Sequence, residues 1–196
     1  FLRAAIKIVK EAGATSLIGD SPSTLRYNDV LEKTGTAKVA AEEKTEILNF
    51  LSYPSVTTGR INLTKYVYDV DGIINLPKLK THTLCTMTLA VKNLFGLVPG
   101  LTKTEFHIHY RTTKAFSEIL AELYGLVRSK LRLSIMDGII GMDGEGPANG
   151  RSRKFGLILA GNDAPAIDTA VYELFGIQPS RIPLIKLCRE KNSGET

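Results

Sequence analysis

Basic residues at every second position give this sequence its clearest chance of doing chemistry. The segment Leu76-Pro77-Lys78-Leu79-Lys80-Thr81-His82 carries two lysines and a histidine in this spacing. Pro77 and the β-branched Thr81 favour an extended backbone, in which side chains alternate between two faces. Lys78, Lys80 and His82 are therefore expected on one side. Ammonium groups bind carboxylates and phosphates, and histidine exchanges protons near neutral pH, so the pattern predicts an anion site.

Lys80, His82 and Lys92 are the candidate catalytic residues. Neighbouring ammonium groups disfavour one another's protonation, and a desolvated neutral lysine can act as a base or form a Schiff base. His82 would be the acid or base, and Lys92 a second cation or covalent anchor. The spacing leaves open whether Lys92 faces the same loop or points elsewhere.

Lys78, Thr81 and Asn93 are candidate ligand-binding residues of the same site. If a helix begins near Thr83, Thr81 and His82 lie at its N-terminus, where free backbone amides favour an anion. The competing interpretation is that the two lysines of the segment are solvated strand-end residues and that His82 is a helix cap.

The elements that must position these residues alternate between strands and helices. Apolar patterning predicts strands at 15–19, 71–76, 131–136 and 155–160, with short extended pieces, such as an edge hairpin, within 49–60. It predicts helices at 2–12, 25–33, 36–47, 83–94, 114–128 and 164–175. This alternation predicts a layered α/β domain with a mostly parallel sheet and helices on both faces. We expect a single domain over residues 1–196, within a fragment or trimmed piece of a longer protein.

Polar residues follow several of the predicted strands. Asp20 and Ser21 come after the first strand, Asp137 after the strand at 131–136, and Asn162 and Asp163 after the strand at 155–160. Ligands of parallel α/β sheets bind beyond the carboxyl ends of the strands. Asp20, Ser21 and Asp137 are therefore added to the candidate ligand-binding residues. Asp168, on the last predicted helix, either reaches this rim or caps a neighbouring element.

A glycine-rich segment, 137–150, is expected to be a loop that covers the ligand or an ordinary surface connection. Gly144 and Gly146 would allow close approach of the backbone to a ligand. The segment matches neither the P-loop nor the dinucleotide-binding pattern. Its acidic residues lack the spacing of a calcium loop, so no metal site is predicted.

Histidine and cysteine spacing gives no stronger metal signal. His107 and His109 would share a side if extended, but without a third ligand they are more simply polar loop residues. Cys85 and Cys188 are expected to be buried free thiols, because neither belongs to a C-x-x-C pair.

Charge and hydropathy narrow the class of protein. The net charge is +5 with a pI near 9.2, but the basic residues are scattered and lack aromatic interleaving, which disfavours nucleic acid as the partner. No apolar run is long enough to span a membrane, and no leader peptide is evident, so no membrane partner and a cytoplasmic location are predicted.

The sequence resembles the family called domain of unknown function 362 over about residues 5–177. The residues that carry this resemblance are Ile74 to His82, Val91 to Gly96, Asp137-Gly138 with Gly144 to Pro147, Gly19 to Pro22, and Leu159 to Asp168. The resemblance implies an uncharacterised bacterial or archaeal domain, often found beside ferredoxin-type domains with four-iron clusters. This chain lacks those cysteines, so no iron–sulfur cluster is expected in it and its own cofactor is unknown. The order of strand, lysine, histidine and helix is also faintly similar to the lactate racemase family.

Two functions remain open from the sequence. The first is an enzyme that binds a small anionic molecule and uses lysine and histidine acid–base chemistry. The alternative is a non-catalytic binding or electron-transfer accessory domain of an iron–sulfur protein, docked to a ferredoxin-type domain through its basic rim. The substrate, the reaction and the oligomeric state are not predicted.

Overall fold

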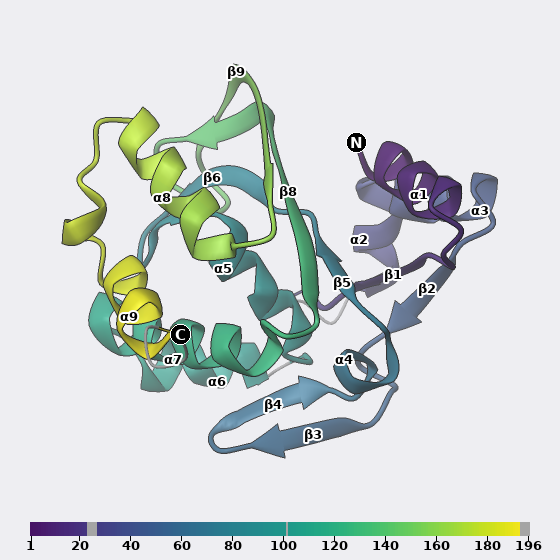
Figure 1. Ribbon diagram of the computed structural model, residues 1–196, viewed down its shortest axis with the longest axis horizontal. Helices are drawn as coiled ribbons and strands as arrows, with labels where there is room; N and C mark the ends of the chain where they lie inside the picture. Colours follow the sequence, from purple (N-terminus) through teal and green to yellow (C-terminus); the bar gives the residue numbers. More distant parts are fainter. Residues whose placement is uncertain (23–26, 101, 193–196) are drawn as a thin grey trace. The chain divides into compact units, whose positions relative to one another are not determined.

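The structure is a computed structural model that describes residues 1–22, 27–100 and 102–192 (Figure 1). The chain divides into two compact units. Unit 1 comprises Phe1–Tyr66 and Gly96–Thr104, and unit 2 comprises Val67–Phe95 and Glu105–Thr196. The predicted α/β class is confirmed, since helices alternate with strands along the chain.

Unit 1 contains a two-stranded parallel sheet and an antiparallel hairpin. Its elements are α1 (Leu2–Glu11), β1 (Leu17–Asp20), α2 (Tyr27–Lys33), α3 (Thr36–Glu42), β2 (Glu46–Asn49), β3 (Ser55–Thr58) and β4 (Ile61–Thr64). Strand β1 pairs with β2, and β3 pairs with β4. The hairpin confirms the extended pieces predicted around Pro54 and Gly59.

The predicted helix at 36–47 is too long. Helix α3 ends at Glu42, and Lys44 has a positive φ of 49°. That backbone conformation stops a right-handed helix, and the chain enters β2 two residues later. The start of the predicted helix at 25–33 lies outside the described residues, while its later part is α2.

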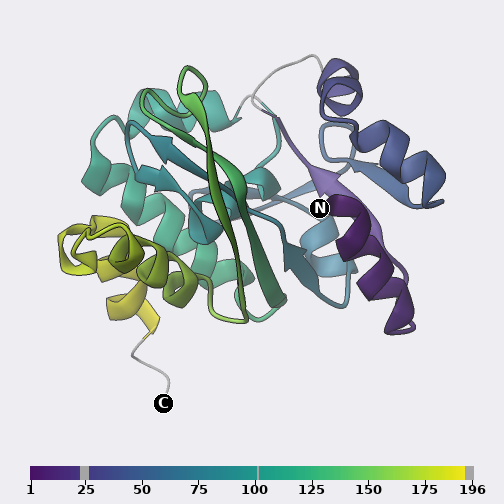
Figure 2. The ribbon, with the colours of Figure 1, turned by 90° about the horizontal axis from the view of Figure 1, so that it is seen from above.

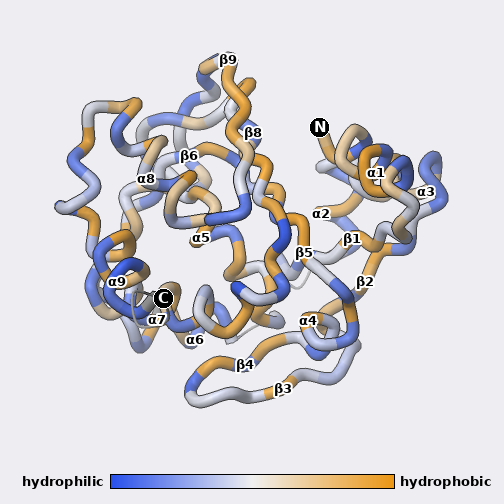
Figure 3. The backbone as a smooth tube through the Cα atoms, in the orientation of Figure 1, coloured by the Kyte–Doolittle hydropathy of each residue, from blue (hydrophilic) through white to orange (hydrophobic). Residues whose placement is uncertain are grey.

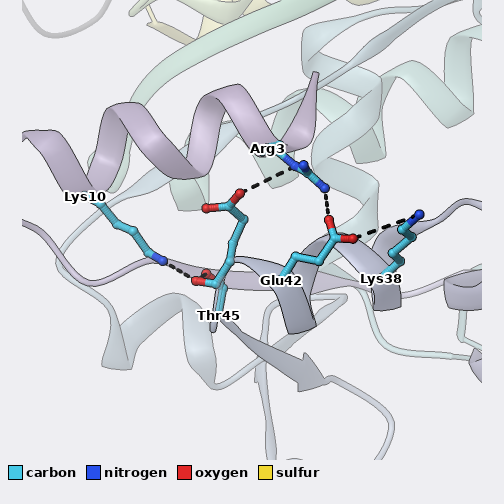
Figure 4. Close-up of polar contacts among 6 residues, drawn as sticks. Arg3, Lys10, Lys38, Glu42 and Thr45 are labelled. Carbon is cyan, nitrogen blue, oxygen red and sulfur yellow. Dashed lines mark hydrogen bonds and ion pairs between the residues drawn. The ribbon is translucent and has the colours of Figure 1, made fainter.

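Charged side chains join α1 to the end of α3 in unit 1. Arg3 forms ion pairs with Glu42 and Glu43, Lys38 pairs with Glu42, and Lys10 donates to the backbone carbonyl of Glu43 (Figure 4). The Arg3 side chain is 45% exposed, and exposed ion pairs contribute about 0 to 1 kcal/mol each. This network therefore orients α1 more than it stabilises the unit.

Unit 2 contains a five-stranded mixed sheet with helices packed together around it. Its strands are β5 (Ile73–Asn75), β6 (Lys78–His82), β7 (Thr86–Thr88), β8 (Leu131–Asp143) and β9 (Arg151–Gly161). Its helices are α5 (Ala90–Asn93), α7 (Thr113–Val127), α8 (Ala164–Leu174) and α9 (Pro183–Asn192), with the short 3₁₀ turn η2 (Pro179–Arg181). Three further elements cross the boundary between the units: α4 (Tyr66–Asp69), the 3₁₀ turn η1 (Leu94–Leu97) and α6 (Thr102–His109).

Strand β8 is the centre of this sheet. It runs parallel to β5 and β6 and antiparallel to β9, while β7 pairs antiparallel with β6. Figures 1 and 2 both show β8 and β9 side by side as a long ribbon.

Strands β5 and β6 lie end to end along the same edge of β8. Ile73 pairs with Leu131, and Lys78 pairs with Asp137, so the register advances in one direction. Pro77 separates the two strands and lacks an amide hydrogen, yet its carbonyl accepts a hydrogen bond from Asp137 N at 2.9 Å. The pairing therefore continues through the proline as one interrupted strand.

Strand β8 is longer than its apolar run predicted. The glycine-rich segment was expected to be a loop from Asp137, but residues 137–143 are strand and only 144–150 connect β8 to β9. Between Lys78 and Lys80 the register against β6 shifts from Asp137 to Met142, so β8 bulges there, while the shift at Gly138/Ile140 places an extra residue in β9. A bulge accommodates extra residues without ending the strand. The glycine-rich composition of residues 137–150 therefore led to a predicted strand end that is too early.

The helix predicted over 83–94 is also wrong in its first half. A turn follows His82, β7 occupies Thr86–Thr88, and α5 begins only at Ala90. Thr86 has a φ of 65°, and threonines on both sides of Met87 suit the alternation of a strand. The apolar spacing was compatible with both structures, and the β-branched residues favoured the hairpin.

Helices α7 and α8 of unit 2 follow their predictions closely. Helix α7 starts after Thr112, whose hydroxyl accepts from Ala115 N, and α8 starts after Asp163, whose carboxylate accepts from Ala166 N. Phe116, Leu120 and Leu123 of α7 are fully buried. The helix α9 was not predicted.

Within the described residues, no helix is long and apolar enough to cross a membrane. Figure 3 shows that hydrophobic stretches are short and interrupted by hydrophilic residues. Both cysteines are buried free thiols, as predicted.

Candidate functional site

Lys78 and Asp137 face each other across β6 and β8. They are register partners, and Lys78 Nζ lies 2.7 Å from Asp137 Oδ2. The other oxygen, Oδ1, accepts from Ile139 N at 3.1 Å. The sequence interpretation placed both residues beyond strand ends. Instead they lie within paired strands, because the chain continues through Pro77 and β8 extends past Met136.

Lys80 follows on the same strand, in register with Met142. It is half-buried, and among the described residues it has no recorded ion pair. Residues 78–82 do form a strand, so alternation continues to predict a common face of β6 for Lys78, Lys80 and His82. Asp137 offsets the charge of Lys78, whereas Lys80 has no counter-ion among the described residues.

Thr81 and the glycines of the β8–β9 connection are in direct contact. Thr81 Oγ1 donates to the carbonyl of Gly144 at 2.8 Å. A Cβ atom at Gly146 would lie 1.9 Å from the carbonyl oxygen of Thr81. Gly144 has a φ of 89°, which L-residues rarely adopt. Packing against β6 therefore explains Gly146, and the positive φ explains Gly144. Contact of either glycine with a ligand stays a prediction.

His82 is buried at the turn that joins β6 to β7. Its Nδ1 accepts a hydrogen bond from Leu84 N at 3.1 Å, so the proton of a neutral ring lies on Nε2. The predicted position at a helix N-terminus is wrong, because a hairpin follows. The ring stabilises that hairpin turn, and its role in proton transfer stays a prediction.

Lys92 lies on α5, against aromatic rings. Its Nζ is 4.7 Å from the ring centre of Phe95 and 5.7 Å from that of Phe116, within the range of cation–π attraction. The sequence had left its direction open, and the structure places it in this aromatic cluster. Its predicted role as a second cation or anchor of the anion site stays a prediction.

Asn93 belongs to a buried polar network that the sequence interpretation missed. Its Nδ2 donates to Asn75 Oδ1 at 2.7 Å, and Asn75 Nδ2 donates to the carbonyl of Ala90 and to Ser134 Oγ. Asn75 is only 5% exposed. An asparagine inside an apolar strand such as Ile73-Ile74-Asn75 was the available signal, because a buried amide needs partners.

Asp168 caps α5 from a distant part of the chain. Its Oδ1 accepts from Ala90 N at 2.6 Å and its Oδ2 accepts from Val91 N at 3.0 Å. Of the two roles left open by the sequence, capping is the one observed. Burial raises the pKa of Asp168 to about 7, against the opposite effect of the two backbone hydrogen bonds.

Asp20 and Ser21 belong to unit 1, apart from the unit that carries the lysines. The Oγ of Ser21 accepts from Gly100 N at 2.8 Å, and the buried Lys103 donates to the Ser21 carbonyl. Asp20 Oδ1 accepts from Ser21 N at 2.7 Å. Lys103, which the sequence interpretation missed, therefore holds the backbone at Ser21. A rim shared by Asp20 and Lys78 stays a prediction.

The structure thus assembles part of the predicted site in unit 2. Strand pairing and hydrogen bonds bring together Lys78, Lys80, Thr81, Asp137 and the connection at Gly144. Over the described residues, no three histidine, cysteine or acidic side chains are grouped closely enough to hold a metal ion.

Comparison with known proteins gives a family but no activity. The family model described as "Domain of unknown function (DUF362)" matches residues 1–173. The chain is 35% identical over 185 residues to the "Thylakoid-associated protein sll1697" of Synechocystis sp. (strain ATCC 27184 / PCC 6803 / Kazusa), covering 92% of this chain and 57% of that protein. The chain therefore spans little more than half the length of this curated relative. No solved structure matches.

The other predicted relationships are not tested by these matches. They say nothing of a ferredoxin-type domain, and the similarity to the lactate racemase family is not shown. Both stay predictions.

Proposed function

Because this chain belongs to the family described as Domain of unknown function (DUF362), a description that names no reaction, we propose a function from the geometry of unit 2. The chain binds a small anionic ligand on the face of β6 and β8 that carries Lys78 and Lys80. One observation carries the proposal: Lys80 lies next to an ion pair that already neutralises Lys78. Among the described residues Lys80 forms no ion pair, so its charge is available to a ligand.

The surroundings of Lys80 support a defined position for the anion. Lys80 is half-buried on a strand that is paired along both edges, to β7 and to β8. A lysine on such a strand has less conformational freedom to lose on binding than a lysine on a loop. The Lys78–Asp137 pair supplies a polar neighbour that adds no net charge, so the proposed ligand is a small carboxylate or phosphate rather than a polymeric anion such as nucleic acid.

Binding can be tested with inorganic phosphate, acetate and citrate by thermal shift at low ionic strength. A ligand that binds only the folded state stabilises it by about 2.7 kcal/mol at a hundredfold excess over its Kd. The substitution Lys80→Met removes the ammonium group and keeps most of the aliphatic chain. Since a hydrogen bond to a charged group contributes about 1.5 to 3 kcal/mol, we expect Kd to rise roughly 10- to 100-fold.

Lys114→Met is the matched control. Lys114 is an exposed lysine of unit 2 near the start of α7, and its loss changes the net charge by the same amount. We expect it to leave Kd unchanged. Equal weakening by both substitutions would show that only long-range charge matters, and a wild-type protein that responds to none of the three anions would overturn the proposal.

We also propose that His82 acts as an acid or base on the bound anion. In His82→Asn the Oδ1 of the new side chain can accept from Leu84 N in place of Nδ1, while the titratable ring is lost. We expect anion binding to persist in this variant and any turnover of a bound carboxylate or phosphate ester to disappear. Unchanged turnover in His82→Asn would show that His82 is not the acid or base of the reaction.

The proposed location is the cytoplasm, which cell fractionation tests directly. The name of the cyanobacterial relative states an association with thylakoids for that protein. Recovery of this chain in the supernatant after membranes are pelleted is the expected result. Recovery in the pellet would instead extend the association of the relative to this chain.

A further inference from the structure

Helix α5 is held at its N-terminus by a residue from elsewhere in the chain. It has only four residues, and a helix this short has little stability of its own. Its N-cap residue, Leu89, has no polar side chain to accept from the first amides. The two carboxylate oxygens of Asp168 accept from Ala90 N and Val91 N instead.

The geometry links this cap to the protonation state of Asp168. An ionised carboxylate accepts hydrogen bonds at both oxygens, whereas a neutral carboxyl group carries a hydrogen on one of them. The hydroxyl oxygen of a neutral carboxyl group is a weaker acceptor than a carboxylate oxygen, so one of the two cap hydrogen bonds weakens on protonation. The side chain is 1% exposed, so water does not compensate for the weaker hydrogen bond.

We propose that the proton on the Asp168 carboxyl group controls how firmly the N-terminus of α5 is held, because both of its oxygens accept from the first amides of that helix. Helix α5 carries Lys92 and Asn93, so the proton also controls the order of these two side chains. This inference stands apart from the anion site on β6 and β8.

Groups on three packed elements surround Asp168. Burial is the main cause of the raised pKa of Asp168. The negative charge of Asp163, just before α8, raises this pKa further. The other titratable neighbours are Tyr172 of α8, Cys188 of α9 and Tyr124 of α7, whose own pKa values Asp168 raises. Burial raises the pKa of Cys188 and of Tyr124 to about 12, and that of Tyr172 is raised as well, so these three stay neutral near pH 7.

The NMR signals of two backbone amides report the protonation state of Asp168. The backbone N–H groups of Ala90 and Val91 donate to the two oxygens of Asp168, so their proton chemical shifts should move together in an NMR pH titration of the wild-type protein. We expect a common midpoint near pH 7. Above the midpoint, hydrogen exchange of these amides, corrected for its intrinsic pH dependence, should slow by on the order of tenfold, the effect of one hydrogen bond to a charged group.

Two substitutions assign the titration. Asp168→Asn keeps one acceptor and cannot ionise, so the shared titration should vanish. Asp163→Asn keeps a good N-cap for α8 and removes only the neighbouring charge, so the titration should persist with a lower midpoint. Wild-type amides that do not titrate between about pH 5.5 and 8.5, or a titration that survives in Asp168→Asn, would overturn the proposal. The wild-type measurement decides the matter even if Asp168→Asn does not fold.

Discussion

Lys78 and Asp137 form an ion pair across two parallel strands, with 2.7 Å between Nζ and Oδ2. The lysine side chain is 49% exposed and the aspartate 16%. Water therefore screens the pair, and its contribution to stability is small, about 0 to 1 kcal/mol. Its larger effect is on the electrostatics of the β6 face, where it offsets one of two positive charges.

Asp137→Asn should strengthen anion binding while it leaves the fold intact. The amide oxygen can still accept from Ile139 N, but Lys78 loses its counter-charge. We expect Kd for phosphate or citrate to fall, and the free energy of unfolding to drop by less than about 1 kcal/mol. Calorimetric titration and urea unfolding measure the two quantities. Weaker binding in Asp137→Asn would mean that the carboxylate, and not the lysines, contacts the ligand.

Gly146→Ala should destabilise the protein. The added Cβ would lie 1.9 Å from the carbonyl oxygen of Thr81, so β6 or the β8–β9 connection must shift. Overpacking of this kind costs about 1 to 3 kcal/mol, measured by urea unfolding.

Gly125→Ala is the control with the opposite sign. Gly125 lies within α7, and its Cβ would meet nothing within 4 Å. Alanine in a helix is more stable than glycine by about 0.5 to 1 kcal/mol, so we expect a gain. If both substitutions changed stability by the same amount and sign, close packing at Gly146 would not be the cause.

Stability should fall as pH rises towards neutrality through the titration of Asp168. Its pKa is about 7 in the folded protein, against 3.8 for an unperturbed aspartate, so the folded state holds its proton over a range in which the unfolded state has lost it. The free energy of unfolding then declines between about pH 4 and 7, by about 1.4 kcal/mol for each unit of pKa difference. Urea unfolding at a series of pH values should show this decline in the wild type. Asp168→Asn should flatten it, and an equal slope in both proteins would contradict the assignment.

Asn75→Ala should cost about 2 to 3 kcal/mol, because it leaves the Ala90 carbonyl and the Asn93 amide without their partners in a buried region. Ser134→Ala removes only the 3.2 Å contact with Asn75 Nδ2 and should cost less. Denaturant unfolding of the two variants ranks them. The reverse ranking would show that Ser134, not Asn75, is central to the network.

Cys85 and Cys188 should react slowly with a thiol reagent at pH 8 while the protein is folded. Burial raises the pKa of each thiol to about 12, which leaves very little thiolate. Both should react fully and fast in urea. Rapid modification of the native protein would show that the segment around one of them opens frequently.

The sequence predicted the fold class and most helices, but not how the strands pair. Helices α7 and α8 were recognisable because their apolar residues recur over three or more turns. Thr83 to Leu94 was ambiguous, since Met87 and Val91 fit a helix face, while Thr86 and Thr88 fit a strand. Tertiary contacts decided it: α5 begins where Asp168 can cap it, and no local pattern reveals a partner 78 positions away.

The site was predicted in part for the same reason. Alternation along a strand is local, so the common face of Lys78, Lys80 and His82 could be expected from spacing. The partner of Lys78 depends on the register of β6 against β8, and that register depends on a bulge in β8. Lys103 drew no attention in the sequence because a buried lysine and an exposed one look alike there.

The end-to-end arrangement of β5 and β6 along β8 makes the spacing before Lys78 critical. Side chains alternate with a period of two, so a single residue inserted between Leu76 and Pro77 would leave β5 in place and invert β6. Leu79 and Thr81 would then exchange sides with Lys78, Lys80 and His82. The number of residues between Ile73 and Lys78 thus determines whether this face of β6 presents the two lysines and His82 or presents Leu79 and Thr81.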